Sequence, residues 1–334
     1  MIRNRHLGDM KSTWQCEANR RTLWISEPFK ISVLGKPRES AMALEQTLIG
    51  WTAPSSDTEQ EKQERTERMI REAITAHKPF SGCQLSIYAK GSYANNTNVR
   101  ADSDVDIAVE CTEVEYWELA EPGIQRSGTP YEGVWTPQKL RAELGAALSA
   151  KFPGRVDASG STAFLIKSSS ARVEADVVPC FSFRYYMSSS SRCGTKIFTT
   201  AGKEIVNYPS QQLENGKAKN ARTGYCFKKA VRVLKRIENA MVASGTHREV
   251  PSYLIECLAY NCPDSTITSA TWTSAVRQML FHIWQRLQGE EPTEENLRWL
   301  EVNECFYLFH PGQKWNRGDG RDFAAAAWNY LGYT

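Results

Sequence analysis

The pattern of apolar and polar positions changes along the chain and predicts two kinds of structure. As far as Tyr208–Pro209, short stretches that alternate with period 2 stand between helical segments, and from Gln211 onward the pattern is helical. Period-2 alternation indicates strands that bury one face. We predict strands at residues 84–89, 102–111, 161–167 and 171–184. The order of the elements, mixed first and all-helical second, predicts an α+β fold.

Helices are predicted where apolar residues recur every three or four positions or where capping residues precede a helical run. In the first half they cover residues 43–50, then a charged stretch over 58–77 that Ser56 or its neighbours can cap, then 137–151. In the second half we predict helices at residues 224–242, 251–261, 274–288, 294–304 and 322–332.

The change of pattern also predicts the domain organisation. Residues 1–40 lack a clear periodicity, and we expect them to form a partly flexible N-terminal extension. Residues 41–210 carry all the predicted strands and should form the core of the molecule. Residues 211–334 should form a separate helical lobe.

Length and composition exclude several classes of protein. The chain has 334 residues, 41% of them hydrophobic and 24% charged, so it can bury a large core without disulfide or metal staples. It has no apolar run of about 18 residues and begins with a polar segment, which predicts no spanning helix and no secretory signal. Nine cysteines without a CxxC pair and five scattered histidines indicate reduced thiols. We therefore expect a cytoplasmic protein with no membrane partner.

The net charge of +3 is less informative than its distribution. The first 40 residues carry eight Lys/Arg and four Asp/Glu, which leaves 33 basic and 34 acidic residues in the other 294. This near-neutral body does not predict binding to long nucleic acids. Residues 102–118 carry seven acids and no base, whereas residues 211–248 carry nine Lys/Arg and two Glu. The two blocks are either solvated faces or a metal site that faces an anionic substrate.

The acidic block contains the candidate chemistry. Gly91–Ser92 is followed, after eleven residues, by Asp104 and Asp106, which on a strand point to the same face about 7 Å apart. Two carboxylates so close repel each other unless a dication lies between them, and oxygen ligands suit Mg²⁺. The Gly–Ser turn can present backbone N–H groups and a hydroxyl to phosphates.

A third carboxylate would complete a two-metal site, and two acids compete for that place. Glu174 and Asp176 lie on one face of a predicted strand, and we choose Asp176 because it leads into an apolar stretch that a proline stops. A DxD pair alone occurs at many acidic strand ends. The ordered combination of Gly–Ser, DxD and a downstream acid on a strand is far more specific.

This combination is typical of the polymerase-β-type nucleotidyltransferases. Four stretches, which include the residues of this combination, resemble the bacterial cGAS-like nucleotidyltransferases of anti-phage signalling, and the resemblance covers residues 43–334. These stretches are GSYANNTNVRADSDVDIAVE, VEADVVPCFSFRYY, IVNYPSQQLENGKAKNARTGYCFKKAVRVLKR and VPSYLIECLAYN.

The resemblance implies a two-lobed enzyme with its active site in the cleft between the lobes. The nucleotidyltransferase core would be residues 41–210, and residues 211–334 would be a lobe similar to that of oligoadenylate synthases. Asp104, Asp106 and Asp176 would be the catalytic residues and would hold two Mg²⁺ ions, with Mn²⁺ as a substitute. Gly91 and Ser92 would bind the donor phosphates.

The implied reaction joins nucleoside triphosphates into a cyclic dinucleotide or oligonucleotide with release of pyrophosphate. A downstream effector would sense the product, and we expect no nucleic-acid activator because the body of the chain is nearly neutral. Two alternatives remain: transfer of a nucleotide to RNA or protein, and a non-catalytic nucleotide-sensing module.

The basic segment supplies candidate phosphate ligands. Lys228, Arg232 and Lys235 fall on one helix face and either point at a triphosphate or form a solvated face. Lys219 and Asn220 match the family's pattern, so they either line the cleft or, for Asn220, cap a helix. The predicted nucleotide-binding residues are thus Lys219, Asn220, Lys228 and Arg232 together with Gly91 and Ser92. In the next helix we expect Ser252 to be an N-cap and Glu256 a structural anchor.

Overall fold

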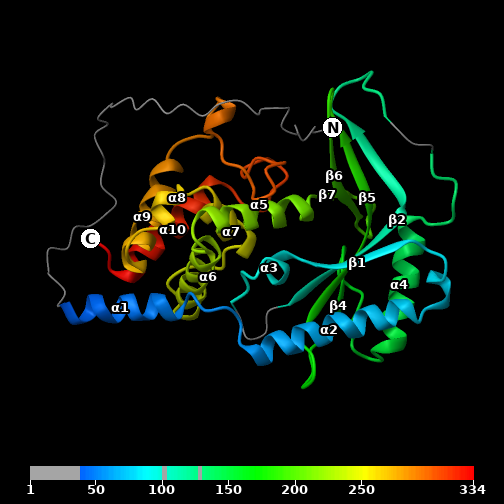
Figure 1. Cartoon of the computed structure of the whole chain (residues 1–334), viewed down its shortest axis with the longest axis horizontal. Helices are drawn as coiled ribbons and strands as arrows, with labels where there is room; N and C mark the ends of the chain where they lie inside the picture. The colour runs from blue at the N-terminus through cyan, green and yellow to red at the C-terminus, as the bar shows by residue number, and fades with distance from the viewer. Residues whose placement is uncertain (1–37, 100–103, 127–129) are drawn as a thin grey trace.

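The computed structural model describes residues 38–99, 104–126 and 130–334, so nearly all of the expected N-terminal extension lies outside the described residues. The described chain divides into a sheet with two flanking helices and a group of helices beside it (Figure 1). This arrangement confirms the predicted α+β fold.

The described strands form one seven-stranded sheet. Its central order is β1-β2-β5-β4-β3, and β6 pairs with β5 and with β7. The pair β2·β5 is parallel, and the other pairs are antiparallel. The strands are β1 (Leu85–Lys90), β2 (Val105–Leu119), β3 (Val156–Asp157), β4 (Phe164–Ile166), β5 (Ala175–Tyr186), β6 (Ser191–Phe198) and β7 (Glu204–Asn207).

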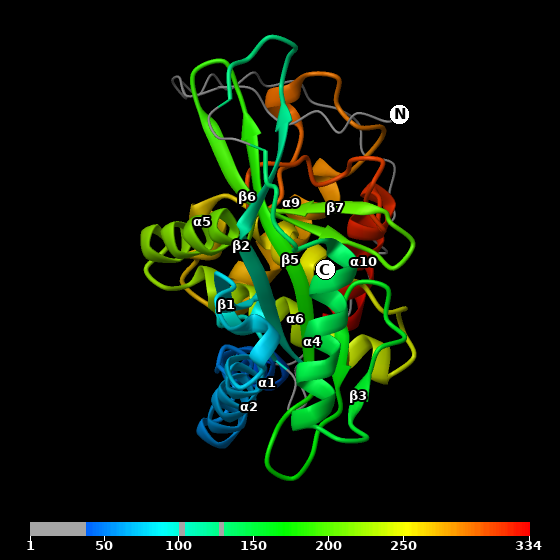
Figure 2. The same ribbon diagram turned by 90° about the vertical axis from the view of Figure 1, so that its right-hand side faces the viewer.

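One face of the sheet is covered by α2 (Asp57–Thr75) and α4 (Pro137–Lys151). Figure 2 shows α4 lying along the strands. Ser56 caps α2 as predicted, because Glu59 N donates to Ser56 Oγ, and Thr136 caps α4, because Lys139 N donates to its hydroxyl. In β2 as far as the irregularity after Cys111, odd-numbered residues such as Ile107 pack in this core, as Ala175 and Val177 of β5 do. In this part of the two strands, the even-numbered residues therefore face the opposite side.

The helical lobe has its own core. Its helices are α1 (Arg38–Gly50), α5 (Pro209–Arg222), α6 (Phe227–Ala243), α7 (Ser252–Tyr260), α8 (Asp264–Ile267), α9 (Trp272–Arg286) and α10 (Arg317–Leu331). The lobe core includes Phe227, Leu258 and Phe323. Leu48 of α1 belongs to the same core, and the Glu45 carboxylate accepts the backbone N–H groups of residues 272 and 273 at the start of α9. The first described helix thus packs with the last hundred residues of the chain.

The predicted helix over residues 294–304 is wrong. The structure forms only the short 3-10 helix η2 (Glu295–Leu297), and the chain then folds back on itself. Leu308 N donates to Trp299 O, and Glu304 adopts a left-handed φ of 54° in the turn between. The apolar spacing reflects burial of Trp299 and Val302 in the lobe core rather than a helix period. The sequence pattern also missed β3, β6 and β7.

No helix in the described ranges is both long enough and apolar enough to cross a bilayer.

The close pairing of β6 with β7 generates a test of the fold. A Cβ added at Gly194 would lie 2.6 Å from the backbone oxygen of Asn207 and 2.9 Å from the Tyr208 ring. We expect Gly194→Ala to lower the free energy of unfolding by about 1–3 kcal/mol, because backbone atoms cannot move aside cheaply. Gly50→Ala is the matched control, since no atom lies within 4 Å of its added Cβ. Urea titration measures the free energy of unfolding of both variants. Equal stabilities of Gly194→Ala and Gly50→Ala would contradict the close packing at Gly194.

Candidate active site

The turn after β1 brings two sequence-distant motifs together. β1 ends at Lys90, and the chain passes at once into the short helix α3 (Gly91–Ala94). Gly91 has φ +65°, and a Cβ at this position would overlap Oδ2 of Asp106. Glycine is therefore required both for the backbone conformation and for the close approach of the turn to the carboxylate. The structure thus places the predicted phosphate turn directly against a predicted metal ligand.

Asp106 and Asp176 are the central pair of carboxylates. They are register partners in the parallel pair β2·β5, so both side chains leave the sheet on the face that α2 and α4 do not cover. Burial first, and the negative charge of Asp106 second, raise the pKa of Asp176. Lys90 opposes this rise in pKa, and its Nζ lies 4.0 Å from Asp106 Oδ1.

Asp104 and Glu174 lie beside this pair. Asp104 is exposed and precedes β2 directly, and the backbone oxygen of Glu174 accepts the N–H of Val105 at the same end of the sheet. Asp176 is therefore the acid aligned with Asp106, as the sequence analysis preferred. Glu174 lies close enough to remain the competitor for a third ligand.

The carboxylate pair fits a divalent cation. Within the described ranges, no three or more His, Cys, Asp or Glu side chains converge as a preformed metal centre. Asp106 and Asp176, however, offer oxygen donors from one sheet face, and the repulsion that raises the pKa of Asp176 is the repulsion that a dication removes. Hard oxygen donors of this kind suit Mg²⁺, and Mn²⁺ accepts the same ligands.

A cleft of about 280 Å³ opens beside Asp106 and is lined by both parts of the molecule, whereas Asp104 and Asp176 are not among its lining residues. The sheet side contributes the turn after β1 and Asp106, and the helical side contributes residues of α5, α6 and α7. The lining residues are Lys90, Gly91, Ser92, Asp106, Asn207, Tyr208, Pro209, Gln212, Lys235, Ser252, Tyr253, Glu256, Glu301 and Asn303.

Lys235 is the basic residue of α6 that reaches the cleft. Its side chain is almost fully buried, and its Nζ lies 3.8 Å from Glu256 Oε2. Burial lowers the pKa of Lys235, and the charges of Glu256 and Asp106 oppose that effect. The sequence favoured neither a phosphate-binding role nor a solvated position for Lys235. The structure places it among the residues that line the cleft.

The other predicted nucleotide-binding residues of this segment are not among the residues that line the cleft. Lys219 is buried and donates to the Cys262 backbone oxygen and to Asp264. Arg232 donates to the backbone oxygens of Thr52 and Asn96. Both cations therefore donate hydrogen bonds to acceptors within the protein.

Asn220 and Lys228 meet at the start of α6. The Asn220 side-chain oxygen accepts the backbone N–H of Lys228, which is the capping arrangement that the sequence left open. The Lys228 side chain is half-buried, and burial lowers its pKa.

Sequence reasoning missed the contribution of α7. Pro251, not Ser252, occupies the N-cap position, so the expected capping role of Ser252 is wrong. Ser252 and Glu256 instead line the cleft together. Their spacing of four residues on a helix was the signal that could have grouped them.

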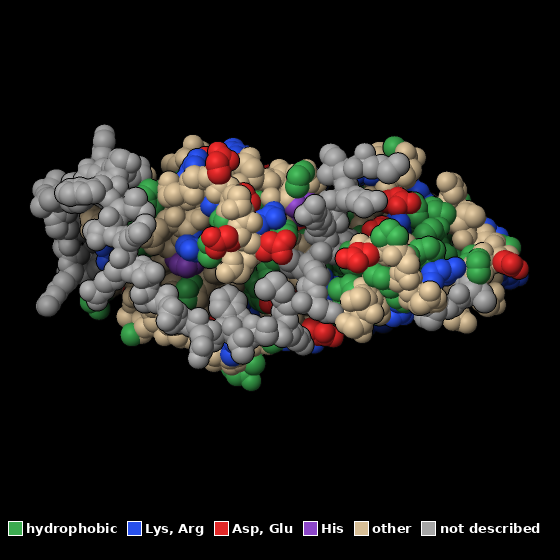
Figure 3. Space-filling model, turned by 90° about the horizontal axis from the view of Figure 1, so that it is seen from above, with side chains coloured by type: hydrophobic (Ala, Val, Ile, Leu, Met, Phe, Trp, Pro, Cys, Tyr) green, Lys and Arg blue, Asp and Glu red, His purple; other side chains and the backbone are tan. Residues whose placement is uncertain are grey.

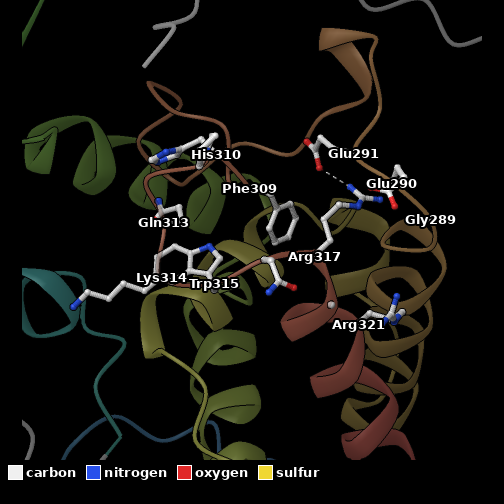
Figure 4. A pocket seen from close by; sticks show the side chains of 13 residues that line it. Gly289, Glu290, Glu291, Phe309, His310, Gln313, Lys314, Trp315, Arg317 and Arg321 are labelled. Carbon is white, nitrogen blue, oxygen red and sulfur yellow. Dashed lines mark hydrogen bonds and ion pairs between the residues drawn. The ribbon is translucent and has the colours of Figure 1, made fainter. Parts of the chain in front are cut away.

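A larger hollow of about 590 Å³ lies elsewhere in the helical lobe, around the start of α10 (Figure 4). Its central cation, Arg317, is paired with Glu291 and donates to the backbone oxygens of Arg286 and Gln288. Lys314 points away from the hollow (Figure 4). Arg317 therefore ties the start of α10 to the segment at the end of α9 and after it, and this hollow shares no residue with the cleft.

Comparison with known proteins gives a consistent assignment. Residues 214–332 match the C-terminal helical domain of cGAS/DncV-like nucleotidyltransferases. A cyclic dipyrimidine nucleotide synthase, CdnE, from Legionella pneumophila is 36% identical, with 86% of this chain and 97% of the relative covered. A cyclic dipurine nucleotide synthase from Elizabethkingia meningoseptica is 32% identical, with 86% and 98% covered.

A solved structure agrees with these relatives. The Elizabethkingia meningoseptica CdnE cyclic dinucleotide synthase, determined with GTP and Apcpp, superposes with a TM-score of 0.72 at 31% identity. The match covers 86% of this chain and 99% of that chain. The fold prediction of a polymerase-β-like core with a C-terminal helical lobe is thereby confirmed.

The choice between Asp176 and Glu174 can be tested by metal binding. In the presence of a non-hydrolysable nucleoside triphosphate, we expect Asp176→Asn to weaken Mn²⁺ binding by about tenfold or more, because Asp176 is aligned with Asp106. Glu174→Gln is the matched control and should change the affinity by less than about threefold. Electron paramagnetic resonance of Mn²⁺ gives both values, and the reverse order would assign the third ligand to Glu174.

Proposed function

We propose that this chain, which belongs to the cGAS/DncV-like nucleotidyltransferase family, joins nucleoside triphosphates into a cyclic dinucleotide and releases pyrophosphate. The named relatives support this proposal, because both are cyclic dinucleotide synthases aligned over 86% of the chain. We further propose that the product is a second messenger of bacterial anti-phage defence, read by a downstream effector. Eight free cysteines in the described part of the chain suit the reducing cytoplasm, where nucleoside triphosphates are made.

The observation that carries the proposal is the Asp106–Asp176 pair, in which Asp106 lies against Gly91 and lines a cleft shared by both lobes. We propose that Asp104, Asp106 and Asp176 hold two Mg²⁺ ions. When bound, these ions lower the pKa of the attacking ribose hydroxyl and neutralise charge on the leaving pyrophosphate. Asp176 orients the hydroxyl, since it lies on the sheet face that borders the cleft.

The phosphate side of the cleft is proposed from its lining. The backbone N–H groups of the turn and the Ser92 hydroxyl bind the β- and γ-phosphates of the donor. Lys235 and Ser252 approach the same space from the helical lobe and add a cation and a hydroxyl. We therefore assign phosphate binding to Lys235 rather than to Lys219 or Arg232, which do not line the cleft and donate to other groups of the protein.

The bases are held, in this proposal, by the side of the cleft that carries amides. Asn207 lines it, and its side-chain amide can both donate and accept a hydrogen bond to a base edge. The Gln212 amide donates to Glu256, and the Asn303 amide donates to Glu301 and accepts the Cys305 backbone N–H. The Tyr253 ring offers a surface for stacking. The two named relatives differ in the bases that they join, so the bases are identified by the product itself.

The reaction is tested with all four radiolabelled nucleoside triphosphates and Mg²⁺, followed by phosphatase treatment and mass spectrometry. We expect a phosphatase-resistant cyclic dinucleotide, and we expect Asp104→Asn with Asp106→Asn to reduce its yield by about a hundredfold or more. Circular dichroism verifies that the variant is folded. Labelled RNA or labelled protein in place of a small product would support the alternative reaction, and an unchanged yield in the variant would refute the mechanism.

No nucleic-acid activator is expected for this reaction. Figure 3 shows acidic and basic side chains interspersed among the described residues of one face, and the sequence of residues 41–334 carries 33 basic and 34 acidic residues. We expect the rate of product formation to stay within about twofold when double-stranded DNA or RNA is added at low salt. A large stimulation by either nucleic acid would contradict this expectation.

A further inference from the structure

The cleft contains a carboxylate whose position needs an explanation. Glu256 of α7 lines the space that the proposed function assigns to phosphates, and a negative charge there repels them. Its residue exposure is only 2%, so the cost of burying it must be offset by specific partners.

The partners of Glu256 come from three different elements. Its Oε2 accepts the Thr97 hydroxyl at 3.0 Å and lies 3.8 Å from Lys235 Nζ. Its Oε1 accepts the side-chain amide of Gln212 at 3.4 Å. One carboxylate therefore ties together α5, α6 and the segment that follows α3.

The contact with Thr97 extends to the phosphate turn. Thr97 is itself buried, and its backbone N–H donates to the backbone oxygen of Ser92 at 2.9 Å. The position of the Ser92 hydroxyl is thus linked to Glu256 through a single residue. The other contact sets where the Lys235 ammonium lies on the opposite wall of the cleft.

We propose that Glu256 is a positioning residue, whose buried carboxylate holds Thr97 and Lys235 at a fixed separation across the cleft. This inference rests on the proposed function, because it treats the Ser92 turn and Lys235 as the two walls that bind the triphosphate. The charge of the carboxylate also opposes the effect of burial, which lowers the pKa of Lys235. Glu256 itself makes no contact with substrate in this role.

The two contacts can be separated by substitution. Glu256→Gln removes the charge beside Lys235 but leaves an oxygen that can accept the Thr97 hydroxyl. Thr97→Val removes the hydroxyl and leaves the charge pair. We expect each variant to raise the Kd of a non-hydrolysable nucleoside triphosphate with Mg²⁺ by about fivefold to tenfold, and Glu256→Ala to raise it more than either.

The matched control is Glu238→Gln. Glu238 is an equally buried carboxylate on α6 that accepts the Val250 backbone N–H and lies outside the cleft lining. Thermal melting should show lower stability for both Gln variants, because each loses a buried acceptor. The nucleotide Kd should rise only for Glu256→Gln, and steady-state kinetics should show the change mainly in KM rather than kcat.

A double-mutant cycle with Lys235→Met completes the test. Because Glu256→Gln acts through the lysine, it should change the nucleotide Kd by less than about twofold when Lys235 is already replaced. The inference is overturned if Glu256→Gln leaves the nucleotide Kd unchanged or if Glu238→Gln raises it equally. It is also overturned if the effects of Glu256→Gln and Lys235→Met on the Kd are additive. Failure of the wild-type protein to bind triphosphates or form product would instead refute the proposed function.

Discussion

The site depends on the parallel pairing of β2 with β5. This pairing places Asp106 directly beside Asp176, and the pleat sends both carboxylates to the face opposite the core formed with α2 and α4. A shift of one residue in register would send one of the two into that apolar core. The alternation of Val105, Ile107 and Val177 into the core therefore fixes the geometry of the acids, and the chemistry is determined by hydrophobic packing on the other side of the sheet.

The helical lobe contributes to the cleft because polar contacts hold it against the core. Arg232 and Arg236 of α6 donate to backbone oxygens of residues 51, 52 and 96, which belong to the segment between α1 and α2 and to the turn after α3. These contacts satisfy carbonyls that irregular segments would otherwise leave without partners. They also use the guanidinium group of Arg232, which the pattern of the helix face would assign to substrate. Lys235, one turn further along α6, is the residue of that face that lines the cleft.

The sequence predicted the parts of this arrangement that have short-range causes. Period-2 alternation located β1, β2, β4 and β5, the capping residues located the start of α2, and the Gly–Ser and DxD motifs located the acids. The parts set by long-range packing were not predictable in the same way. Residues 294–304 have helical spacing but fold into a turn, because Trp299 and Val302 are buried by helices distant in sequence. The partners of Lys219 and Lys235 likewise come from other elements, which no local pattern records.

The balance of charge within the cleft gives a physical reason for the divalent cations that we propose as cofactors, in addition to the protein's own lysines. Asp106, Glu256 and Glu301 line the cleft against Lys90 and Lys235, and Asp176 adds a further acid beside Asp106. Glu256 is matched to Lys235 and Asp106 lies near Lys90, so the protein retains little positive charge for a triphosphate. A polyanion that entered alone would meet net repulsion. A triphosphate accompanied by Mg²⁺ brings the missing positive charge to the carboxylates, so that binding of the metal and binding of the nucleotide favour each other at one place.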